Sequence, residues 1–255
     1  MGATGPLAIL RALAPRPRSD RVSARARRLL VKTLYTQPAS LAIGALTGIT
    51  ATGVSAYVAR LPELYAGATV LTAIALLRVV SAMGLSPDSG RTSTAKLEII
   101  YEIGAFSYAL AIGVVGAMTI WLGAPGEVQV LMVANTLCYG VGVSARNAGR
   151  PSIAIGQLAL SLLPVMGACV AQGSAAMLTL AATITLLIPA MMSIVLNISK
   201  VLRDSIASAE TSSKLADRMQ VLARTDVVTG RANRAGLNHS MVETMMSIDE
   251  DTRLA

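Results

Sequence analysis

Residues 64–84 read LYAGATVLTAIALLRVVSAMG and include one charged side chain, Arg78. An apolar run of about 20 residues is long enough to cross the hydrocarbon core of a bilayer as an α-helix. The rest of the chain has the same character, since 53% of its residues are hydrophobic and only 14% are charged, whereas an ordinary soluble domain has about 25% charged residues. The composition excludes such a domain and indicates an integral membrane protein.

Six apolar runs of this length follow one another along the chain, separated by short polar breaks. Glycine and proline inside them do not argue against spanning, because neighbouring helices can satisfy the backbone groups that these residues leave free. We therefore predict an all-α fold, a polytopic membrane bundle of about six transmembrane helices followed by a cytoplasmic stalk helix. The predicted spans are residues 39–59, 64–84, 99–122, 127–145, 152–171 and 174–198.

The distribution of Lys and Arg predicts the orientation of the spans, because short positively charged segments stay in the cytoplasm. Residues 1–38 contain eight basic side chains against one acid, Asp20, while on the opposite side Arg60 is offset by Glu63. The other basic residues next to spans on the predicted cytoplasmic side are Arg91, Lys96, Arg146, Arg150, Lys200 and Arg203. We expect a multi-pass protein with both termini in the cytoplasm.

This topology also accounts for the net charge of +8. The basic residues flank spans and are not interleaved with aromatic side chains, so we expect the lipid bilayer as a partner and no nucleic acid. Cys138 and Cys169 lie inside predicted spans without metal-ligand spacing, and the single histidine, His239, follows the last span. We therefore predict no metal or cofactor site in this chain.

Charged and small residues inside the spans are candidates for functional or packing roles. Arg78 and Glu102 fall at similar depth on two antiparallel neighbouring spans, which leaves two interpretations open. Either the two side chains form an ion pair within the membrane, or Arg78 reaches the lipid head groups and Glu102 lies at the interface. Gly44 and Gly48 form a GxxxG segment, which indicates either a dimer interface or close packing within one bundle.

After residue 198 the chain becomes charged and favours helix. Val201, Ser208, Leu215 and Leu222 recur at seven-residue spacing, which predicts a stalk helix at residues 199–223 that favours a parallel homodimer. The alternative is a plain amphipathic linker.

The stretch that follows carries a motif. Residues 222–234 read LARTDVVTGRANR, which resembles the first motif of the GGDEF family, the diguanylate cyclase domain, written Asp-x-Leu-Thr-Gly-Leu-x-Asn-Arg. Val228 and Arg231 stand where the family usually has leucine. The matching residues are Asp226, Thr229, Gly230, Asn233 and Arg234.

The resemblance implies a bacterial inner-membrane protein of cyclic di-GMP signalling. Members of the family join two GTP molecules with the help of Mg²⁺, but their catalytic residues lie further along than residue 255. We therefore expect 224–255 to be a truncated start of a GGDEF domain, with no catalytic residue and no cyclase activity in this chain, and GTP and Mg²⁺ to be needed only by a complete domain.

These features together predict four regions: a basic segment at 1–38, a six-span sensory and anchoring domain at 39–198, the stalk at 199–223 and the GGDEF start at 224–255. The sequence leaves the sensed ligand unidentified. Two alternatives remain open, a non-catalytic membrane partner of full-length relatives and a small transporter.

Overall fold

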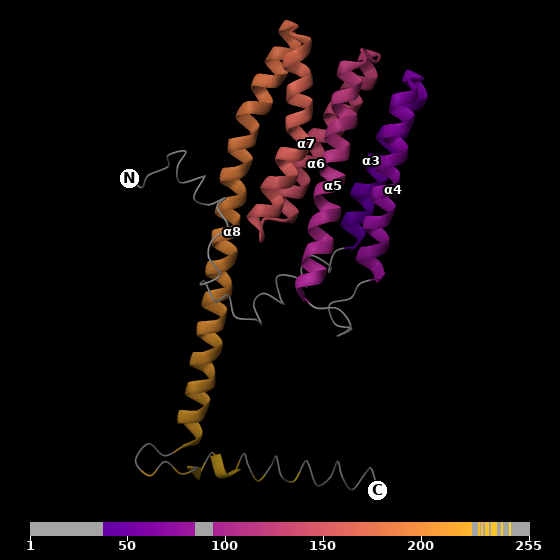
Figure 1. The fold of residues 1–255 in the computed structure, drawn as a ribbon. Helices are drawn as coiled ribbons and strands as arrows, with labels where there is room; N and C mark the ends of the chain where they lie inside the picture. Colours follow the sequence, from indigo (N-terminus) through magenta and orange to yellow (C-terminus); the bar gives the residue numbers. More distant parts are fainter. Residues whose placement is uncertain are drawn as a thin grey trace, which may run out of the picture. The chain divides into compact units, whose positions relative to one another are not determined.

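The computed structural model describes residues 38–84 and 94–225, with scattered residues between 229 and 245. Within these residues the fold is built from α-helices (Figure 1). All six helices are long and apolar enough to cross a membrane. This confirms the predicted all-α bundle and makes the chain a multi-pass membrane protein. The helices are α3 (Pro38–Ala59), α4 (Pro62–Gly84), α5 (Thr94–Trp121), α6 (Gly126–Arg146), α7 (Pro151–Gln172) and α8 (Ala175–Arg224).

The observed helices coincide with the predicted spans, with differences at two ends. α5 begins at Thr94, five residues before the predicted span, because hydropathy does not register the polar first turn of a helix. α8 continues for 50 residues without a break, so the segment expected as a stalk is the second part of this helix. The chain divides into two compact units, residues 1–199 and 200–255.

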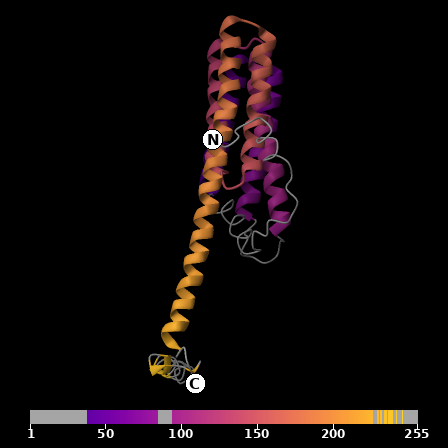
Figure 2. The ribbon, with the colours of Figure 1, turned by 90° about the vertical axis from the view of Figure 1, so that its left-hand side faces the viewer.

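Two of the connections are short because glycine ends the preceding helix. Gly123 and Gly173 have φ values of 64° and 72°, which other residues rarely adopt. Gly173 follows α7 in the left-handed conformation, and its N–H donates to the Cys169 carbonyl at 3.3 Å. Such a residue satisfies a free carbonyl at the helix end and turns the chain, and Figure 2 shows α7 and the first half of α8 side by side after this turn.

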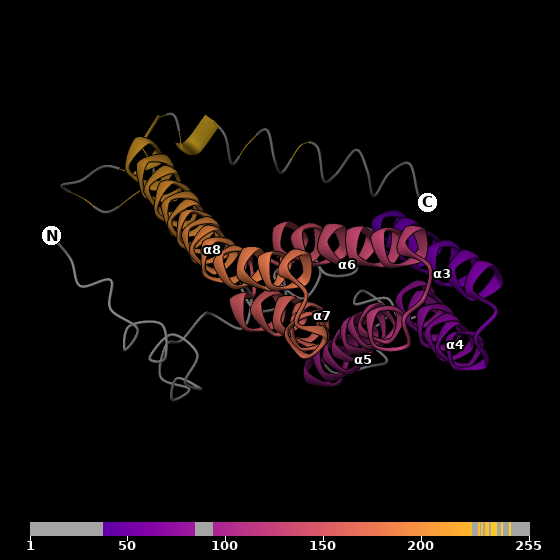
Figure 3. The same ribbon diagram turned by 90° about the horizontal axis from the view of Figure 1, so that it is seen from above.

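α5 is the central helix of the bundle. Viewed along the helix axes, it lies between α4 and α7 (Figure 3). It also contacts α6, which in turn lies next to α3. Most of these helices are apolar around their whole circumference, so large side chains such as Leu77 and Leu186 are exposed, at 72% and 74%. In a bilayer these side chains face lipid tails, which are as apolar as leucine.

At Gly113 the backbones of α5 and α7 approach one another closely. A Cβ placed on Gly113 of α5 would lie 2.5 Å from the Ser161 carbonyl oxygen and 2.9 Å from the Ser161 Cα atom on α7. Because these atoms belong to a helix backbone, they cannot move aside as a flexible side chain would. Gly113 therefore sets the distance between the two helices that make the most extensive contact.

Replacing Gly113 by alanine is expected to destabilise the bundle by about 1–3 kcal/mol, the usual range for overpacking a filled core. The measurement is the apparent melting temperature of the purified protein in neutral detergent. Gly167→Ala on α7 is the matched control, since a Cβ there would meet no atom within 4 Å. Equal melting temperatures for the two variants would contradict this account of the α5–α7 contact.

Candidate functional site

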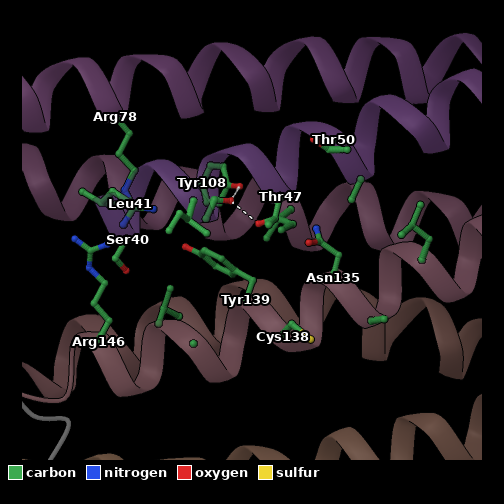
Figure 4. Close-up of a pocket in the computed structure, with 18 of the residues that line it drawn as sticks. Ser40, Leu41, Thr47, Thr50, Arg78, Tyr108, Asn135, Cys138, Tyr139 and Arg146 are labelled. Carbon is green, nitrogen blue, oxygen red and sulfur yellow. Dashed lines mark hydrogen bonds between the residues drawn. The ribbon is translucent and has the colours of Figure 1, made fainter. Parts of the chain in front are cut away.

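The bundle contains a cavity of about 760 Å³ lined by α3, α4, α5 and α6 (Figure 4). One end is polar, where Ser40, Arg78 and Arg146 lie close together. The remaining wall is mostly apolar, apart from two tyrosines and a few small polar side chains. Many lining residues of α3 and α6 are also exposed, so the cavity communicates with the surroundings of the bundle between these two helices.

Arg78 is the principal charge of this cavity. It is only 9% exposed, and its guanidinium carbon lies 5.7 Å from the ring centre of Tyr101 and 5.6 Å from that of Tyr108. Aromatic faces attract a cation at such distances by about 0.5–2 kcal/mol. Among the described residues, no hydrogen-bond partner meets the buried Nε and Nη2 atoms of Arg78. The guanidinium therefore lies against two aromatic rings and also shares a side-chain hydrogen bond with Tyr139.

The sequence left two possibilities for Arg78: an ion pair with Glu102, or a side chain that reaches the lipid head groups. Within the described residues the structure contains no ion pair between Arg78 and Glu102, and it encloses Arg78 in the bundle. An ion pair does form one turn away, between Glu98 in the first turns of α5 and Arg150 at the start of α7. This ion pair joins the amino-terminal ends of α5 and α7, the two helices that also meet at Gly113.

A chain of buried hydrogen bonds supports the tyrosines beside Arg78. The Tyr101 hydroxyl donates to Asn147 Oδ1 at 3.0 Å, and the Asn147 amide donates to Gln157 Oε1. Gln157 Nε2 donates to the Tyr139 hydroxyl at 2.9 Å and to the Ala105 carbonyl at 3.2 Å. Gln157 and Asn147 are 0% and 1% exposed. One side chain of α7 thereby fixes two tyrosines that come from α5 and α6.

Tyr108 extends this support to α3. Its ring packs edge to face with Tyr139 at 5.2 Å between centres, and its hydroxyl donates to the Gly44 carbonyl at 2.9 Å. A Cβ on Gly48 would collide with the Tyr108 hydroxyl. The structure thus places Tyr108 of the same chain against the GxxxG segment.

The described residues of the motif follow the end of α8. Asn233 donates from its backbone N–H to the Arg224 carbonyl at 2.9 Å and from Nδ2 to the Ala223 carbonyl at 2.8 Å. Its Oδ1 accepts from the Gly236 N–H at 2.9 Å. Asn233 therefore closes the carboxyl end of α8 and caps the helical turn that begins at Arg234. Thr229 lies in the turn between them, while Asp226 and Gly230 fall outside the described residues.

Cysteine, histidine and carboxylate side chains are dispersed. Among the described residues no group of three such side chains is placed to hold a metal ion. Cys138 lines the cavity as a free thiol, and Cys169 is buried in the apolar core between α7 and α8.

The buried polar network was missed by sequence reasoning. Its members, Tyr101, Tyr108, Tyr139, Asn147 and Gln157, are spread over three helices and one turn, and each is a single polar residue in an apolar surrounding. The available signal was the amide of Gln157 inside an apolar span, because a buried amide requires partners.

Comparisons with family models, with curated proteins and with solved structures find no match for this chain.

Replacing Gln157 by leucine removes the centre of the network and leaves the Asn147 amide and the Tyr139 hydroxyl without their partner. A buried polar group without a partner costs about 1–3 kcal/mol, so we expect a lower melting temperature in detergent. Thr183→Val is the control, since the Thr183 hydroxyl is exposed and bonds only to its own helix. A Gln157→Leu protein as stable as the control would show that the network does not hold the bundle.

Proposed function

We propose that this chain is the membrane sensory and anchoring region of a signalling protein of the diguanylate cyclase type, in a bacterial inner membrane with both termini in the cytoplasm. The observation that carries the proposal is the continuity of α8. One helix leads from the membrane span to the segment that resembles the first GGDEF motif, and Asn233 of that segment bonds to its last turn.

A continuous helix is a suitable transmitter. Fifty residues of α-helix extend about 75 Å. The backbone hydrogen bonds that continue along α8 on both sides of Pro189, which itself has no N–H to donate, would carry a rotation or shift from one end to the other. The cap at Asn233 then couples the end of α8 to the helical turn after Arg234. In a complete cyclase this is the route by which a change in the bundle would reach the catalytic residues.

The far part of α8 also supports the proposed homodimer. Val201, Leu215 and Leu222 are exposed at 58%, 55% and 59%, although they recur at heptad spacing. Apolar side chains in such a seam are usually buried against a second helix. A parallel pair of α8 helices would cover them and bring two output domains together, as a reaction between two GTP molecules requires.

The functional test joins residues 1–234 to the remainder of a complete diguanylate cyclase domain. Membranes containing this chimera are expected to form cyclic di-GMP from GTP. Inserting four residues after Ser213 turns the two parts of α8 by about 40° relative to one another and should change the rate severalfold, whereas inserting seven keeps the heptad seam and should preserve it. Equal rates for both insertions would leave an anchor without a transmitting role and contradict the proposal.

The dimer is tested separately by cross-linking in a Cys138→Ser, Cys169→Ser background. Leu215→Cys is expected to give a covalent dimer on mild oxidation of membranes, because seam residues of two parallel helices face each other. Ser213→Cys, on the opposite face of α8, should give little. Cross-linking of both variants to the same extent, or of neither, would argue against a specific seam.

A further inference from the structure

Arg78 brings a positive charge to this cavity and has no ion-pair partner among the described residues. Arg146 also lines the cavity, and no Asp or Glu does so among the described residues. A buried cation in a membrane protein is normally matched by an acid or by backbone carbonyls, because an uncompensated charge in a low-dielectric interior is costly. The rings of Tyr101 and Tyr108 compensate only part of this charge.

Hydrogen-bond donors are also left over at this cavity. Five buried side-chain atoms lack a hydrogen-bond partner in the described residues, and three of them, Arg78 Nε, Arg78 Nη2 and Asn135 Nδ2, belong to residues that line it. Figure 4 shows Arg78 reaching into the polar end beside Arg146, with Asn135 further along. Two adjacent N–H groups of a guanidinium suit one group above all, an oxyanion.

The shape of the cavity restricts what carries the oxyanion. The cavity follows α3 from Ser40 to Val54 and α6 from Arg146 to Leu131, which corresponds to about 20 Å of helix. An acyl chain of one bilayer leaflet covers about half of the ~30 Å hydrocarbon core. Beyond the arginines the wall is formed largely by apolar side chains such as Leu41, Ile112 and Val143. The length and the apolar wall therefore suit an acid group with one hydrocarbon chain.

The position of the cavity agrees with entry from the membrane. Arg78 lies six residues from the end of α4 at Gly84, about 9 Å along the helix axis and so within reach of the depth of lipid head groups. The cavity is bordered by exposed side chains of α3 and α6, including Ile43 at 63% and Leu131 at 36%. A lipid-dissolved molecule reaches it between these helices without crossing water.

We propose that this cavity is a binding site for a single-chain amphiphile with an oxyanion head, a carboxylate or a phosphate. Arg78 donates from Nε and Nη2 to the head, Arg146 adds a second positive charge, and the chain lies along α3 and α6 toward Val54. The proposal does not rest on the proposed function, because binding is a property of this chain alone and is measured without any signalling output.

The experiment uses the full chain, purified in neutral detergent and freed of lipid, with three probes of equal chain length. They are palmitic acid, palmitoyl lysophosphatidic acid and palmityl alcohol, and binding is followed by isotope-labelled ligand at increasing concentration. We expect saturable binding of one equivalent of an acid and no saturable binding of the alcohol. Preference for the carboxylate or for the phosphate identifies which of the two heads the site takes. Equal binding of acid and alcohol would overturn the proposal.

Two variants locate the site. Arg78→Gln is expected to weaken binding of the acid at least about tenfold, the effect of losing a charge-assisted hydrogen bond. Gly142→Phe tests the cavity without altering charge, because Gly142 lines it and a Cβ there would meet no atom within 4 Å. Gly142→Phe should weaken binding of the acid to a similar degree. If Arg78→Gln does not fold, this variant alone tests whether the acid binds in the cavity.

The matched control is Gly53→Phe, which also has open space around its Cβ but does not line the cavity. It should bind the acid as the unaltered chain does. Unchanged binding in Gly142→Phe, or an equal loss in Gly53→Phe and Gly142→Phe, would show that the acid binds elsewhere or only as part of the detergent layer.

Discussion

The hydrogen bonds of Gln157 are the constraint on which the centre of this bundle depends. In a bilayer an unsatisfied amide cannot turn to water, so the side chain has to find its partners inside the protein. It accepts from Asn147 and donates to Tyr139 and to the Ala105 carbonyl, which fixes the rotation of α7 relative to α5 and α6. Gly113 then allows these helices to approach at that rotation.

The surroundings of Arg78 follow from this arrangement. Tyr139, oriented by Gln157, supports the ring of Tyr108, and Tyr108 in turn contacts α3 and the guanidinium of Arg78. The arginine is thus supplied with aromatic faces rather than with an acid, while Glu98 of α5 pairs with Arg150. The cavity is what remains between α3 and α6 once the tyrosines occupy the middle of the bundle.

The spans were predictable because length and apolar character alone decide whether a segment crosses a membrane, and all six appear as helices. The orientation of each helix about its own axis was not predictable, because a helix that is apolar all round gives no stripe from which a facing side can be inferred. Arg78, Tyr108 and Gln157 could therefore be found as unusual residues but not assigned to one another. Asn233 was found through its motif, but its two hydrogen bonds to the end of α8 could not be predicted from the sequence.

The two unpartnered N–H groups of Arg78 have an energetic consequence for the bundle as a whole. A two-state equilibrium moves from 1:99 to 99:1 when one state is favoured by about 5.5 kcal/mol. Hydrogen bonds to a charged group contribute about 1.5–3 kcal/mol each, so two such bonds supply a free energy of that order. An oxyanion bound at Arg78 would therefore stabilise the helix arrangement that presents these two N–H groups over any arrangement that does not, and an arginine already paired within the fold could not supply that free energy.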